Sequence, residues 1–264
     1  MEYKMKESLR KYLITGILIA LFLTYYNIKL VTGLEKSSIE LLLVYNYGYL
    51  ELSSIKYLIP IILWSIPQMY LIYSLKDTIA SSLYRNSVYI FTRTNKRSFW
   101  ILKEFKILFF HIIFYYGVQF ITVISMGYIL GLKFYPINKS LFIILILFIL
   151  VCLTNYILIL TINVLALKIS LTYSFCIGIL INICSVFSMG FINEVYPKWL
   201  SIIKIIPSSQ SIINWHTNSL VGFYNLLEIK EVQFCFSYSI GYLTLLCLIL
   251  IGCGVYIFKN MDIV

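Results

Sequence analysis

Six long stretches of apolar residues, none of which contains a charged side chain, constrain this sequence more than any other feature. An α-helix needs about 20 apolar residues to cross the hydrocarbon core of a bilayer, and each stretch is close to or beyond that length. Strands of a membrane barrel would instead alternate over about ten residues between turns. We therefore predict an all-α integral membrane protein with a single transmembrane domain over 1–264. The six predicted spans cover about 12–31, 57–75, 107–132, 140–167, 169–192 and 236–258, and the charge-free part of the first ends at Ile28, before Lys29.

Composition supports this class and indicates how the chain is oriented. The chain is 61% hydrophobic and only 12% charged, which excludes a water-soluble globule. Its net charge of +10 lies between the apolar stretches rather than on a face that could follow phosphates, so we expect no nucleic-acid partner. With the N-terminus inside, thirteen of the 21 Lys and Arg residues are cytoplasmic, and the net charge is +8 inside and +2 outside. We predict that both termini are cytoplasmic.

The sequence offers little material for catalysis or for self-powered transport. Proton-coupled carriers and intramembrane hydrolases place charged groups near the bilayer midplane, and the six stretches contain no Asp, Glu, Lys or Arg. No G-x-x-x-x-G-K-[ST] motif for ATP is present, and two His with six Cys outside any C-x-x-C pattern predict no metal site. We expect no enzyme activity and no cofactor, and any energy for transport would come from a partner chain.

Two predicted cytoplasmic segments carry a more specific pattern. Met1, Met5 and Leu9 recur at helical spacing among charged residues, which predicts an amphipathic helix on the inner leaflet, the alternative being a frayed basic tail. Between the second and third spans, the segment 76–106 combines an apolar helical face, a basic break and an aromatic restart at Trp100.

This order of features resembles the ABC-2-type permease subunits, the six-span class of ABC exporters. The resemblance is to the small Gram-positive permeases that handle bacteriocins, lantibiotics and other peptide antibiotics, and the ending Tyr256-Ile-Phe-Lys-Asn-Met-Asp-Ile263 is similar too. It implies a bacterial plasma-membrane protein with a second permease chain and separate cytoplasmic ATPase subunits as partners. It also implies that a coupling helix within 81–97 docks on the ATPase, with contacts from Ser81, Arg85, Arg93, Lys96 and Arg97.

The predicted extracellular loop 193–235 is too apolar to stand in water. Two short helices that dip into the outer leaflet and meet at Pro207 would bury that surface, and an interfacial aromatic belt is the alternative. In the resembled family, re-entrant helices at this place cap the exit of the path. On that reading the outer gate candidates are Trp199, Pro207 and Trp215.

Uncharged polar residues within the spans either line a path or hydrogen-bond between helices. In the resembled permeases the second and fifth spans flank the path, which makes Gln68 and Asn182 the path-lining candidates. The expected function is a permease subunit of an ATP-driven exporter of amphipathic cargo, such as an antimicrobial or toxic peptide or a lipid-like drug. The alternative is a non-transporting membrane immunity or sensor protein that binds a peptide antibiotic.

Overall fold

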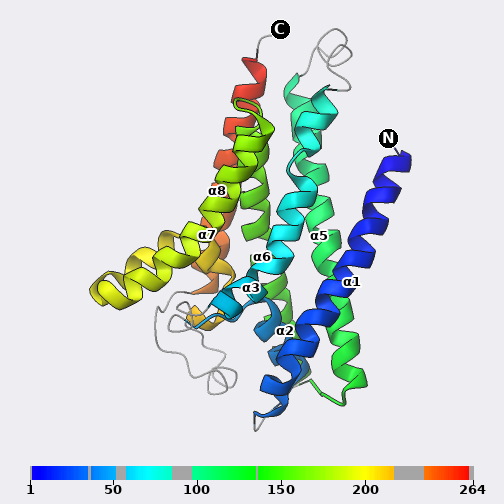
Figure 1. Ribbon diagram of the computed structural model, residues 1–264, viewed down its shortest axis with the longest axis vertical. Coiled ribbons are helices and arrows are strands. Elements are labelled where there is room, and N and C mark those ends of the chain that lie inside the picture. The colour runs from blue at the N-terminus through cyan, green and yellow to red at the C-terminus, as the bar shows by residue number, and fades with distance from the viewer. Residues whose placement is uncertain are drawn as a thin grey trace.

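The structure is a bundle of long helices with short helical pieces at one end (Figure 1). The computed structural model describes residues 2–34, 37–51, 58–84, 97–134, 136–216 and 235–261, and every regular element there is helical. The elements are α1 (Glu2–Thr32), α2 (Ile39–Tyr47), α3 (Leu58–Leu75), α5 (Arg97–Ile129), α6 (Ile137–Leu165), α7 (Leu171–Val195), η2 (Pro197–Ile205), η3 (Pro207–Ser211), η4 (Ile213–Trp215) and α8 (Phe236–Lys259).

Five helices in the described part of the chain are long and apolar enough to cross a membrane: α1 from Leu9 onward, α5, α6, α7 and α8. The prediction of an all-α membrane protein is therefore confirmed at this level. The predicted second span corresponds to α3, which has 18 residues and lies outside those five. At 1.5 Å per residue α3 is about 27 Å long, slightly less than a typical hydrocarbon core. The sixth span stays a prediction.

The first helix differs in form from the expectation. The sequence predicts an interface helix that leads into the first span, whereas α1 runs from Glu2 to Thr32 as one unbroken helix. No proline occurs before Pro60, and the first glycine, Gly16, lies in mid-helix, so nothing in the sequence forces a break. Beyond Leu9 the helix packs along α5, where Gly16 lies against Val118 and Tyr115.

The central core joins α1, α2, α5, α6 and α8, and the start of α1 and the end of α8 lie at the same end of the bundle (Figure 1). A tight connection of residues 166–170 links α6 to α7, and the Ser170 side chain caps α7 by accepting a hydrogen bond from the Tyr173 backbone N–H. The C-terminal part of α7 projects sideways from the bundle and contacts η2 (Figure 1). A second, smaller apolar cluster forms there around Trp64, Met189 and Trp215.

The sequence prediction missed α2 completely. This nine-residue helix lies in a segment predicted to be an outside loop, yet eight of its residues are buried among α1, α5 and α6. Even the Glu40 side chain is only 1% exposed, and the Ser140 hydroxyl on α6 donates a hydrogen bond to its carboxylate at 3.0 Å. A run of nine residues is too short to predict as a span, and only its packing in the bundle reveals its position.

Candidate functional site

The two polar residues predicted to line a path lie in direct contact with each other. The side-chain amide of Asn182 on α7 donates a hydrogen bond to the side-chain oxygen of Gln68 on α3, at 3.1 Å. Both side chains are buried, so the bond joins two helices through the interior. In this conformation the two side chains hydrogen-bond between helices, which is one of the two roles that the sequence left open, the other being to line a path.

A small polar cavity lies directly beside this pair. Its volume is about 10 Å³, which is near the minimum for one water molecule. Side chains from several elements line it: Tyr47, Trp64, Pro67, Gln68, Tyr116, Val151, Asn155 and Ser211. The hydroxyls of Tyr47 and Tyr116 and the indole N–H of Trp64 are buried and have no hydrogen-bond partner among the described residues.

Buried donors without partners are rare because each one costs about 1–3 kcal/mol relative to a bonded group. Their grouping around one cavity marks this region as a place where a polar guest would be stabilised. We call the cavity together with the Gln68–Asn182 pair the polar seam. Its wall includes α2 and η3, two elements that the sequence alone did not place there.

Short helices close the bundle next to the polar seam. In η3 the residues Ser208 to Ser211 are all buried, and the Ser208 hydroxyl donates to the Ser185 hydroxyl of α7 at 2.7 Å. Pro207 begins this element at its first position, where a missing N–H is tolerated. Within the predicted loop 193–235, residues 208–216 are thus buried in the bundle and η2 is largely exposed, while residues 217–234 lie outside the described part.

Hydrogen bonds fasten residues 207–216, which we call the closing segment, to the chain just after α2. The Asn214 side chain accepts from the Leu50 backbone N–H and donates to the Leu50 carbonyl, both at 3.1 Å. The Trp215 indole N–H donates to the same carbonyl at 2.8 Å, and the Ile213 N–H donates to the Gly48 carbonyl at 2.8 Å. Two irregular segments that are distant in sequence therefore satisfy each other's backbone groups, as buried irregular backbone requires.

The three outer gate candidates differ in burial. Trp215 is 1% exposed and Pro207 at the start of η3 is half-buried, whereas Trp199 on η2 is 60% exposed. The adjacent His216 is buried and stacks on Phe236. Its Nδ1–H donates to the Ile212 carbonyl at 3.0 Å, and its Nε2 forms a hydrogen bond with the Ser239 hydroxyl at 2.8 Å. Burial lowers the pKa of His216 to about 4.

At the opposite end of the bundle, the structure describes part of the predicted coupling segment. Ser81 lies in helical residues 78–84, and its backbone N–H donates to the Asp77 carbonyl. Arg97 begins α5, and its guanidinium donates to the Met261 carbonyl beyond α8 at 3.4 Å. Arg85, Arg93 and Lys96 lie outside the described residues.

The described flanks of this segment are fixed to the bundle. Asn163 of α6 donates to the Leu75 carbonyl at 3.0 Å and accepts from the Ile79 backbone N–H at 3.3 Å. It therefore holds the end of α3 and the start of the next helical stretch together. The Ser82 hydroxyl also donates to the carboxylate of Glu104 on α5, at 3.2 Å.

No protein-family profile, curated protein or solved structure matches this chain. The site must therefore be interpreted from its own chemistry. Within the described residues, no three His, Cys, Asp or Glu side chains gather as metal ligands would. The polar seam offers amide, hydroxyl and indole groups, which can hydrogen-bond a guest but supply no activated nucleophile.

Proposed function

We propose that this chain is the membrane-spanning permease subunit of an ATP-driven ABC exporter. It would lie in a bacterial plasma membrane with six spans, α3 being the second, and with both termini in the cytoplasm. Its cargo would be amphipathic, such as an antimicrobial or toxic peptide or a lipid-like drug. The partners would be cytoplasmic ATPase subunits and a second permease chain.

The observation that carries the proposal is the polar seam under its closing segment. Polar side chains of α3, α6 and α7 meet in the interior, and short 3₁₀ helices joined by hydrogen bonds lie over them. A permease needs both parts, because a path requires polar groups within an apolar wall and a closed state requires something that seals it. Irregular backbone is tolerated in a membrane protein where protein surrounds it, as it does here.

The contacts that hold residues 75–84, next to the predicted coupling helix, support the same proposal. Asn163 ties the end of α3 to α6, and α3 also carries Gln68 of the polar seam. A force applied by a partner near residues 78–84 would therefore act on a helix that lines the seam. Coupling by a rigid element needs this kind of continuous contact between two sites.

One observation favours the alternative, a non-transporting membrane immunity or sensor protein. The cavity in the polar seam has room for about one water molecule, so this conformation has no open path for a large cargo. An exporter in its closed state and a protein that never opens share this property. The two functions differ in whether the chain needs an ATPase.

Co-purification tests the proposal directly. The tagged chain would be purified from its native membranes in mild detergent, and retained proteins would be identified and assayed for ATP hydrolysis. We expect a cytoplasmic chain with a phosphate-binding loop whose ATPase activity responds to cargo in the reconstituted complex. If no ATP-hydrolysing chain is retained, the exporter assignment is wrong.

Charge reversal tests the coupling residues within that complex. Arg93→Glu together with Arg97→Glu should uncouple ATP hydrolysis from export while leaving membrane insertion intact. Lys168→Glu is the matched control, because this exposed basic residue lies in the α6–α7 connection on the same predicted side. Unchanged cargo-stimulated ATPase activity in the double variant would remove the coupling assignment.

A further inference from the structure

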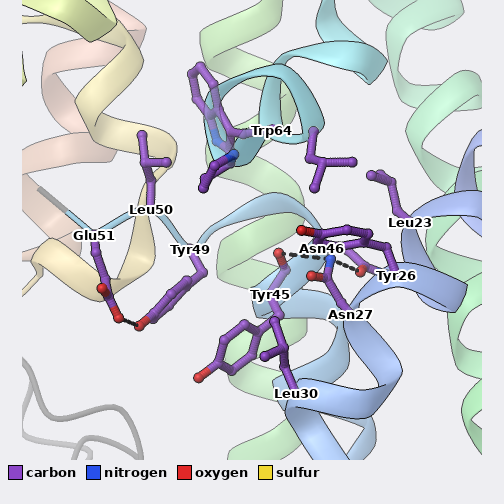
Figure 2. Close-up of a pocket in the computed structure, with 12 residues that line it drawn as sticks. Leu23, Tyr26, Asn27, Leu30, Tyr45, Asn46, Tyr49, Leu50, Glu51 and Trp64 are labelled. Atoms are coloured by element: carbon purple, nitrogen blue, oxygen red, sulfur yellow. Dashed lines mark hydrogen bonds between the residues drawn. The ribbon is translucent and has the colours of Figure 1, made fainter. Parts of the chain in front are cut away.

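A second, larger cavity lies between the ends of α1, α2 and α3, separate from the polar seam (Figure 2). Its volume is about 200 Å³, many times the roughly 10–15 Å³ that one water molecule needs. Trp64 of α3 lines both cavities and so stands between them. The larger cavity has no role in the function proposed above.

Aromatic rings form much of its wall. Tyr26 of α1, Tyr45 of α2, Tyr49 and Trp64 all line it (Figure 2). Tyr45 and Tyr49 stack with centroids 4.4 Å apart and an interplanar angle of 29°. The face of an aromatic ring carries partial negative charge and attracts cations, most strongly when the cation is weakly hydrated.

A carboxylate completes the chemistry. Glu51 lines the cavity and is exposed, and the Tyr49 hydroxyl donates a hydrogen bond to it (Figure 2). The described residues that line the cavity include no Lys or Arg. The cavity therefore presents a carboxylate and several aromatic rings to a guest.

Hydrogen bonds hold the two helices that form the floor of the cavity. The Asn27 amide of α1 donates to the side-chain oxygen of Asn46 on α2 at 2.8 Å, and Asn46 donates to the Thr24 hydroxyl at 3.3 Å. Both asparagines are buried. A cavity whose walls are already held in place loses little conformational freedom when a ligand enters.

We propose that this cavity binds the quaternary ammonium head of a small amphipathic molecule. The Tyr and Trp rings contact the methyl groups of the cation, and the Glu51 carboxylate balances its charge. Apolar side chains at the same cavity, including Leu30 and Leu63, contact the first carbons of the attached tail. The inference is independent of the exporter assignment, because binding requires neither ATP nor a partner chain.

Choline and its neutral isostere 3,3-dimethyl-1-butanol provide a test that isolates the charge. The full chain would be reconstituted in nanodiscs of phosphatidylglycerol, and each probe would be titrated by calorimetry. We expect saturable choline binding and at least about tenfold weaker binding of the isostere, since shape alone is conserved between them. Equal binding of the two probes, or no saturable binding of choline, would overturn the proposal.

Variants locate the binding within the molecule. Glu51→Gln and Tyr49→Ala should each weaken choline binding by about threefold to tenfold. Glu194→Gln, at another exposed acid on α7, should leave choline binding unchanged. Because Glu51 is exposed, its replacement by Gln should leave folding intact, which the unfolding temperature of each variant would verify. Unchanged choline affinity in both cavity variants would refute the assignment.

A further arm identifies the source of the ammonium group. Nanodiscs that contain phosphatidylcholine should compete with free choline if a lipid headgroup can enter from the bilayer. Full choline binding in those nanodiscs would assign the cavity to free amphiphiles instead. Both results support recognition of a quaternary ammonium, and they differ only in how the ligand arrives.

Discussion

Replacing Asn163 tests how the end of α3 is held to the bundle. The Asn163 side chain is fully buried on α6 and bonds two backbone groups that belong to other parts of the chain, the Leu75 carbonyl and the Ile79 N–H. Asn163→Ala removes both contacts at once. Among the described residues, only the Asn163 side chain accepts a hydrogen bond from the Ile79 N–H. The substitution would therefore leave this buried donor without a partner.

The magnitude follows from these two bonds. An unpartnered buried N–H costs about 1–3 kcal/mol, and loss of the second bond adds about 1 kcal/mol. The second term is small because the Thr78 hydroxyl also donates to the Leu75 carbonyl, at 3.2 Å. We expect a total loss of about 2–4 kcal/mol in the free energy of unfolding, beyond the effect of deleting the side-chain atoms themselves.

Asn155→Ala is the matched control, because it deletes the same atoms from the same helix. Asn155 is also buried, but its amide donates within α6, to the Val151 carbonyl at 2.9 Å. Both variants would be compared by equilibrium unfolding in mixed micelles and by hydrogen exchange at the Ile79 amide. We expect Asn163→Ala to be the less stable by about 2–4 kcal/mol, with exchange at Ile79 faster by about 30-fold or more. Stabilities within about 0.5 kcal/mol of each other, with Ile79 still protected, would refute the reasoning.

Two further predictions concern close packing and pH. A methyl group at Gly254 on α8 would lie 2.5 Å from the Phe105 ring, whereas one at Gly252 would meet nothing within 4 Å, so Gly254→Ala should lower the unfolding free energy by about 1–3 kcal/mol and Gly252→Ala should not. Equal thermal stability of the two variants would show that α8 does not approach α5 this closely. His216 has a pKa of about 4 in the folded chain against an ordinary 6.5, so its contribution to stability is present above pH 6.5 and is lost as the pH falls toward 4, by about 3 kcal/mol at most. Unfolding measured across this range should show that slope, His216→Gln should flatten it, and an equal slope in both proteins would assign the acid response to other groups.

The sequence predicted those features that depend on local composition. Charge-free stretches of sufficient length identify a membrane helix without any knowledge of its neighbours, because backbone groups in lipid must be satisfied within the helix itself. For this reason α6, α7 and α8 lie close to their predicted positions, whereas α5 begins at Arg97, ten residues before the predicted span 107–132. Local composition also exposes the uncharged polar residues of the apolar stretches, but the choice of Gln68 and Asn182 among them came from the resemblance to permeases whose second and fifth spans flank the path.

The features that were missed depend on which segments meet. α2 is too short to stand out, and its burial, with Glu40 inside, results from contacts with α1, α5 and α6. The bonds between Leu50 and the segment of Asn214 and Trp215 join residues more than 160 positions apart, and no local pattern encodes such a pairing. The cavity bounded by Tyr26, Tyr45, Tyr49 and Trp64 likewise exists only once three helices have packed.

By itself, then, the sequence determined that this chain is helical and carries segments long and apolar enough to cross a membrane, because those properties follow from the length and composition of its apolar stretches. Only the tertiary structure decided that Gln68 and Asn182 bond to each other, that residues 207–216 close the bundle, and that an aromatic cavity with a carboxylate lies beside α1. Helices in lipid gain little from burying apolar surface, so their arrangement depends on close packing and on a few polar contacts between distant residues. Those contacts become visible when the helices are brought together.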